Sequence, residues 1–243
     1  MDQLRTRLRT NDAARLLGSR DPRIFTASQI TTRSRGCYWD YTDVCAFFFC
    51  VVILGTLLRL AVVFHLLSAF SIQQPTALVQ AVVSVCILLA LYAILEFRHG
   101  GAVWQALGWT LPSCGYVLAA PLGGMLLAAG VTLVARSRGI PTPSVIPWKI
   151  AALAATVGPV LEESFFRGCL LPLVERTSGS PAAVILTALL FAFFHQPPTV
   201  LHRACFAVSG IAYGWVRVAS RSTTAAALMH AAYNLTLFAC QTW

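Results

Sequence analysis

Long apolar runs separated by short polar breaks dominate the chain from about residue 44 onward. A helix rises 1.5 Å per residue, so about 20 consecutive apolar residues cross the hydrocarbon core of a membrane. Seven runs approach or exceed this length and predict membrane-spanning helices. They cover 44–71, 77–95, 113–135, 150–174, 181–196, 203–218 and 222–241.

The runs show no alternation of apolar and polar residues, which argues against strands. Inside lipid, every backbone polar group has to be satisfied within the chain, and a helix does this by itself. The predicted fold class is therefore all-α, a polytopic transmembrane helical bundle of about seven spans. The fifth and sixth runs are short, so we expect them to be buried in the bundle or to flank a water-filled dip.

Changes of composition divide the chain into three predicted parts. Residues 1–43 form a polar, arginine-rich segment with interleaved leucines, a pattern that suits a basic helix on an anionic membrane surface. Residues 44–149 hold the N-terminal transmembrane helices, and 150–241 hold a core of four further helices.

The composition points to an integral, multi-pass membrane protein in contact with membrane lipid. Of 243 residues, 57% are hydrophobic and 11% are charged, and the mean hydropathy is +0.71. Soluble domains carry about 25% charged residues, so a water-exposed globular fold and intrinsic disorder are excluded. The net charge of +9 predicts no nucleic-acid partner, because eight of the 18 lysines and arginines lie in the first 35 residues.

Basic residues give conflicting signals for orientation. The arginine-rich N-terminus predicts a cytoplasmic start, whereas Arg136, Arg138 and Lys149 indicate that a later loop is cytoplasmic. The orientation therefore stays open. Lys149 is the only lysine, a bias typical of GC-rich coding sequences, and we expect a bacterial cell membrane.

Two adjacent glutamates, Glu162 and Glu163, lie near the middle of the fourth run. An ionisable group at this depth costs at least about 2.5–3.5 kcal/mol, which makes a functional role the first hypothesis. Arg167 follows Glu163 by four residues and shares its helix face, while Glu162 points about 100° away. We expect the guanidinium to keep one carboxylate charged while the other serves chemistry. A plain ion pair that holds helices together is the structural alternative.

Two later runs carry matching polar groups. His195 ends the fifth run, four residues after Phe191, and His230 and Asn234 share a face of the seventh. Measured from one membrane side, Glu162, His195 and Asn234 lie about 18–20 Å deep and His230 about 12 Å. Carboxylate, imidazole and amide groups from three helices are thus predicted at overlapping levels.

These residues resemble the signature of the CPBP family of intramembrane proteases. Glu162, Glu163 and Arg167 match its EExxxR motif, Phe191 and His195 match FxxxH, and His230 and Asn234 match HxxxN. The family includes type II CAAX prenyl endopeptidases, bacteriocin-processing and immunity proteins, and a lysostaphin-resistance type. The resemblance covers about 150–241 and implies an endopeptidase (a peptide hydrolase) for a membrane-associated peptide or lipidated protein, with prenylated CAAX-type proteins among the candidates.

The resemblance also implies residue roles. Glu162 would be the general base, Glu163 and Arg167 would support it, and His195, His230 and Asn234 would bind the water or the oxyanion. Peptide hydrolysis needs such a base beside a water and donors aimed at the developing oxyanion.

A metal stays open as an alternative to a metal-free glutamate enzyme. Glu162, His195 and His230 would suffice as ligands for a catalytic zinc, in the manner of a metalloprotease. The chain has no HExxH motif, however, and an asparagine amide is a poor zinc ligand. We expect no required cofactor.

Other intramembrane protease chemistries do not fit. All five aspartates precede the first run, and neither GxSG nor HExxH occurs. Two non-catalytic alternatives stay open: a scaffold or immunity protein that keeps the motif as a polar clasp, and, less favoured, a transporter. Transporters often show internal repeats, which this chain lacks.

Overall fold

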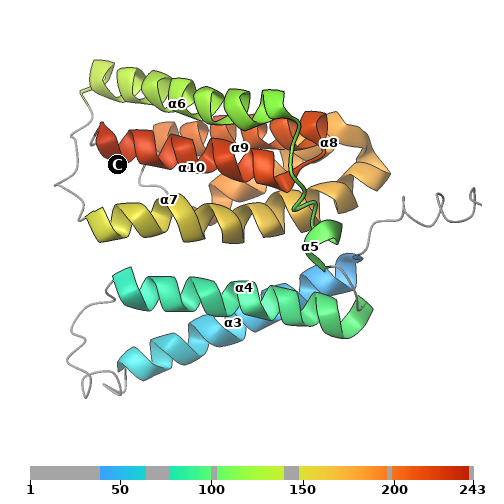
Figure 1. The fold of residues 1–243 in the computed structure, drawn as a ribbon. Coiled ribbons are helices and arrows are strands. Elements are labelled where there is room, and N and C mark those ends of the chain that lie inside the picture. Colours follow the sequence, from blue (N-terminus) through green and yellow to red (C-terminus); the bar gives the residue numbers. More distant parts are fainter. Residues whose placement is uncertain (1–38, 64–76, 100–102, 140–147, 196–198, 241–243) are drawn as a thin grey trace, which may run out of the picture. The chain divides into compact units, whose positions relative to one another are not determined.

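The computed structural model describes residues 39–63, 77–99, 103–139, 148–195 and 199–240 (Figure 1). Every regular element in these ranges is helical, which confirms the all-α prediction. The elements are α3 (Tyr41–Val63), α4 (Ala77–His99), α5 (Val103–Ala106), α6 (Cys114–Ser137), α7 (Trp148–Glu163), the π-helix η2 (Ser164–Leu170), α8 (Leu171–Phe194), α9 (Val200–Ser220) and α10 (Thr223–Ala239). Most of the predicted basic segment, and the end of the first predicted run, lie outside the described residues.

Two helical stretches within the described ranges are long and apolar enough to cross a membrane. They are Cys114–Ser137 and Ala151–Phe194, and the second combines most of α7 with η2 and α8. The sequence predicts a break inside this second stretch, between 174 and 181. Gly179 provides it with φ 75° and ψ 164°, a backbone conformation that side chains with a Cβ rarely adopt. The stretch is therefore kinked at Gly179.

The π-helix η2 follows directly after Glu163, and the sequence pattern did not predict it. All seven of its residues are buried. Its first residue, Ser164, accepts a hydrogen bond of 3.1 Å from the Trp109 indole and donates one of 2.6 Å to the Val160 carbonyl. Short π-helical segments occur often at functional sites, because the extra residue re-aims the side chains that follow. Arg167 is one of those side chains.

Helix α10 is central to the packing and contacts α6, α7 and α9 (Figure 1). Its contact with α6 is close because small residues recur every fourth position along α6. The buried members of this row are Ala120, Gly124, Ala128 and Thr132. A Cβ at Gly124 would lie 2.1 Å from the Met229 carbonyl oxygen, so only glycine permits this approach. Met229 precedes His230, and the contact thereby sets the position of a candidate site residue.

The segment between α5 and α6 anchors the start of α10 through its backbone carbonyls. Thr223 donates to the Leu107 carbonyl from its hydroxyl (2.6 Å) and to the Gly108 carbonyl from its backbone amide (2.8 Å). Ser222, which caps α10, donates to the Thr110 carbonyl at 2.6 Å. The same segment holds η2 through Trp109. Two elements that carry candidate site residues are thus attached to one short loop.

Candidate active site

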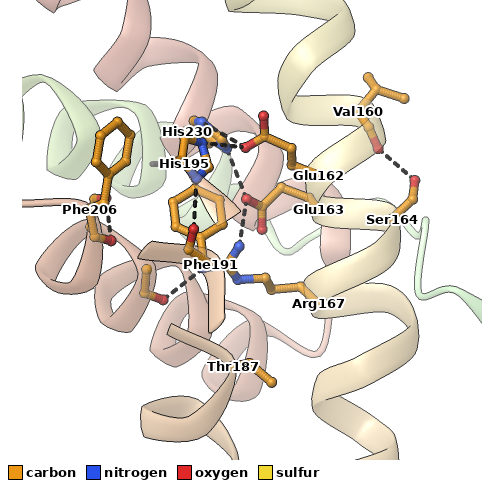
Figure 2. Close-up of polar contacts among 12 residues, drawn as sticks. Val160, Glu162, Glu163, Ser164, Arg167, Thr187, Phe191, His195, Phe206 and His230 are labelled. Carbon is orange, nitrogen blue, oxygen red and sulfur yellow. Dashed lines mark hydrogen bonds and ion pairs between the residues drawn. The ribbon is translucent and has the colours of Figure 1, made fainter. Parts of the chain in front are cut away.

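The six residues predicted from the sequence lie on four helical elements. Glu162 and Glu163 end α7, Arg167 lies in η2, His195 follows α8, and His230 and Asn234 lie on α10. Polar contacts join the first five into one cluster (Figure 2). Asn234 is buried one helical turn beyond His230.

The inner part of the cluster centres on the Glu163 carboxylate. Its Oε1 atom accepts a hydrogen bond from Arg167 Nη1 at 3.0 Å and lies 2.9 Å from His230 Nδ1. Arg167 Nη2 donates to the Gly210 carbonyl at 2.8 Å. The side chains of Glu163 and Arg167 are fully buried. Burying two charges is tolerable because they are paired and hydrogen-bonded to further groups.

Aromatic rings surround the Arg167 guanidinium. Its central carbon lies 4.8 Å from the Phe191 ring centre, 5.4 Å from that of Tyr213 and 5.7 Å from that of Phe166. A ring face carries partial negative charge and attracts a cation at these distances. This contact gives Phe191, the first residue of the second motif, a role beside the arginine.

The outer part of the cluster centres on Glu162, whose side chain is 30% exposed. Glu162 Oε2 lies 3.5 Å from His195 Nε2 and 3.9 Å from His230 Nε2. The His195 side chain is 21% exposed and that of His230 only 6%. The Glu162 side chain is therefore partly exposed while its buried Oε2 atom faces two imidazoles, whereas Glu163 bonds the arginine, as the spacing of these residues predicts.

Residues 143–236 match the family model described as Rce1-like, type II CAAX prenyl endopeptidase Rce1-like. This segment, which is less than half of the chain, is similar to the Rce1-like family. The match contains all six candidate residues and confirms the recognition made from the three motifs. The family is a membrane-embedded protease family, which at that level supports peptidase activity and a membrane location. No curated protein and no solved structure matches the chain.

The hydrogen bonds of the Rce1-like segment assign the tautomer of both histidines. His195 Nδ1 lies 2.7 Å from the Phe191 carbonyl oxygen, and His230 Nδ1 lies 2.9 Å from the Glu163 carboxylate. These oxygens only accept, so each Nδ1 carries a proton. In the neutral ring, Nε2 then has a lone pair directed toward Glu162. A lone pair and a carboxylate repel, and either a proton on Nε2 or a water between the two groups removes this repulsion.

The same three groups form the candidate zinc set. Within the described residues, no three His, Cys, Asp or Glu side chains have the spacing of a metal site. Zinc at Glu162, His195 and His230 stays an alternative to the metal-free site, and we derive no step through a metal.

The Rce1-like segment also contains groups that sequence reasoning missed. Phe206, Gly210 and Tyr213 lie on α9, which carries none of the three motifs. Each contacts a basic group of the cluster. No sequence signal marks them, because aromatic and small residues are common in apolar helices. His202, also on α9, bonds Thr199 at the helix start, away from the cluster's polar contacts.

Proposed function

We propose that this chain is a multi-pass intramembrane endopeptidase in which Glu162 activates water to hydrolyse a peptide bond. One observation carries the proposal: two adjacent carboxylates have opposite environments. Glu163 is fully buried and bonded to Arg167 and His230, whereas Glu162 is partly exposed and faces two imidazole nitrogens. A general base has to reach both a water and a substrate, and only Glu162 meets this requirement.

The proposed reaction uses groups of the protein alone. A water held between Glu162 Oε2 and His195 Nε2 gives a proton to the carboxylate while its oxygen attacks the scissile carbonyl carbon. The C–O bond forms and the carbonyl electrons move to the oxygen. Glu162 then passes the proton to the leaving nitrogen as the C–N bond breaks. Atoms and charge balance without a cofactor.

His230 and Asn234 are proposed to stabilise the oxyanion. His230 is held by Glu163 at Nδ1, with its Nε2 atom on the side of Glu162. The Asn234 amide lies one turn further along the same helix and supplies a second donor. Donors already in place where charge develops are worth about 3–4 kcal/mol each in acyl transfer.

The proposed setting is the cell membrane of a bacterium, with about seven spans formed by the helices of the described segments. The proposed substrates are membrane-associated peptides or lipidated proteins, including those with a prenylated CAAX-type terminus, and lipid is the other partner. The family match supports a CAAX-type endopeptidase, and the apolar helices support the membrane.

The experiment is a survey of protein termini in cells that express the wild-type chain or Glu162→Gln. New C- and N-termini should arise with the wild type and be absent with the variant. Glu96→Gln is the matched control, because Glu96 is exposed near the end of α4, outside the cluster. Identical termini in wild-type and Glu162→Gln cells would contradict the proposal.

A further inference from the structure

We infer that one face of α9, formed by Phe206, Gly210 and Tyr213, positions the three basic groups of the site. Its effect on catalysis rests on the proposed function, whereas the arrangement itself does not. Positions 206, 210 and 213 are spaced by four and three residues, so they share one face of a helix. This face adds no charged side chain to the cluster.

Each residue of the α9 face contacts a basic group of the site. The Phe206 ring stacks on His195, with centroids 4.3 Å apart and 27° between the planes. The Gly210 carbonyl accepts the hydrogen bond from Arg167 at 2.8 Å. The Tyr213 ring stacks on His230 at 4.6 Å and 17°. Along α9, Phe206 therefore contacts the more exposed imidazole, His195, and Tyr213 contacts the buried one, His230.

Tyr213 carries the largest part of this inference. It is 1% exposed, and its ring lies against both His230 and the Arg167 guanidinium. Those two groups bond the same oxygen of Glu163. The ring therefore restrains both donors of one carboxylate. A His230 ring that turned about its Nδ1 bond would move Nε2 away from Glu162, and the Tyr213 face opposes this rotation.

The ring, rather than the hydroxyl, performs this task. Ser209 is the side chain that lies nearest to bonding the Tyr213 hydroxyl among the described residues, and its own hydroxyl donates instead to the Phe206 carbonyl at 3.0 Å. Phenylalanine should therefore replace tyrosine without loss, whereas leucine fills similar space but has no flat face. A role in core packing alone would allow leucine with a modest loss of stability and no loss of turnover per folded molecule.

The kinetic test compares Tyr213→Phe, Tyr213→Leu and the control Trp215→Leu, an exposed aromatic residue on α9. The folded fraction of each variant is measured from its thermal melting curve in detergent without substrate. Turnover is then divided by the concentration of folded protein. We expect kcat to fall about 10- to 100-fold for Tyr213→Leu, since a small misplacement of a catalytic group has that effect. KM should change little, Tyr213→Phe should stay within about 2-fold of wild type, and Trp215→Leu should not differ. Phe206→Leu should lower kcat in the same way, through His195.

A second measurement needs no activity. With histidine-selective isotope labelling, the His230 ring resonance is assigned by its loss in His230→Gln. Stacking should shift this resonance upfield relative to the unfolded chain, with the shift kept in Tyr213→Phe and lost in Tyr213→Leu. If Tyr213→Leu does not fold, the wild-type and Tyr213→Phe spectra still decide the stack.

The outcomes separate the two proposals. An unshifted His230 resonance in the wild type, or equal kcat in Tyr213→Leu and Tyr213→Phe, would overturn the role of α9. A shifted resonance in a chain that cleaves no peptide would leave the arrangement standing and overturn the proposed function instead.

Discussion

Two arginine–carboxylate pairs in the described part of the chain show how similar groups serve different ends. Arg98, near the end of α4, contacts Asp43 in the first turn of α3 at 2.5 Å and Asp40 at 3.5 Å. Arg167 contacts Glu163 at 3.0 Å within one helical run. The Arg98 side chain is 38% exposed and that of Arg167 fully buried. The first pair joins two helix ends, and the second lies inside the bundle.

The difference lies in what each pair holds in place. The Arg98 contacts with Asp40, Thr42 and Asp43 connect residues at the ends of two neighbouring helices, so we interpret this group as a clasp. The Arg167 pair adjoins a second carboxylate, Glu162, that faces two imidazoles. A buried pair is an expensive way to hold helices together, since apolar residues do this as well or better. The added carboxylate is therefore what separates a reactive site from a clasp.

The strongest way to break this comparison is Glu162→Gln. The substitution keeps the shape of the side chain and removes the base, so we expect kcat to fall by about 10³-fold with the melting temperature unchanged. Glu163→Gln should reduce activity less, because the amide oxygen still accepts from Arg167 and His230. The measurement is peptide cleavage by purified protein in detergent. Near-wild-type turnover in Glu162→Gln would mean that the base is misassigned.

The next largest effect is expected for Arg167→Ala. It leaves Glu163 buried without its cation, and breaking such a pair costs about 3–5 kcal/mol. Activity should fall as well, because Glu163 then no longer has a fixed position from which to orient His230. The double variant Arg167→Leu with Glu163→Leu should regain much of the stability but not the activity.

A double-mutant cycle on unfolding free energy measures the coupling between these two positions. Additive losses would show that Arg167 and Glu163 do not act as a pair. Substituting Arg167 also removes its hydrogen bond to the Gly210 carbonyl, and the stability lost with that bond is not part of the coupling energy that the cycle measures.

A smaller effect is expected at the clasp. Arg98→Met should lower the unfolding free energy by about 1–3 kcal/mol, because it leaves Asp43 buried beside fewer donors. Activity per folded molecule should not change, since no site residue depends on this pair. Arg138→Met, at an exposed arginine after α6, is the control. A lower kcat in Arg98→Met, at equal folded fraction, would show that the Arg98 group contributes to activity and is more than a clasp.

Acid should weaken the same clasp. The Thr42 hydroxyl, followed by the Asp43 backbone amide, hydrogen-bonds Asp40 and lowers the pKa of that carboxyl below its ordinary value of 3.8. A lowered folded-state pKa adds stability above the ordinary value, and this is lost as the pH falls through the lowered one. The melting-temperature difference between wild type and Asp40→Asn should therefore shrink as the pH falls below about 4. If the melting-temperature difference between wild type and Asp40→Asn stayed constant as the pH fell below about 4, the lowered pKa of Asp40 would not be its cause.

The smallest expected effect is that of chelators. With no metal required, stripping the protein should leave turnover within about 2-fold, and elemental analysis should find well below one zinc per chain. One bound zinc per chain, with activity lost on removal and restored on addition, would replace the glutamate-only mechanism by a metal-assisted one.

Local sequence patterns predicted the helices of this protein more completely than the contacts within its candidate site. The apolar runs predicted helices in the right places, including the break that Gly179 makes within α8. The four-residue spacing predicted the pair of Glu163 and Arg167, since one helix turn decides it. The motifs predicted the family. The π-helix η2 was not predicted, because its hydrogen bonds shift by one residue without any change in the apolar pattern.

The sequence by itself determined the helices, the motifs that resemble the family and the list of candidate site residues, since these depend on composition and on neighbours within a turn. Tertiary structure alone decided which imidazole each glutamate meets. That choice depends on His230, 67 residues from Glu163, and on the close contact of α6 with α10 that positions it. It also decided the part played by α9, whose rings and carbonyl have no chemistry of their own. Ring faces and carbonyl directions acquire a role only when packing sets them against a charge.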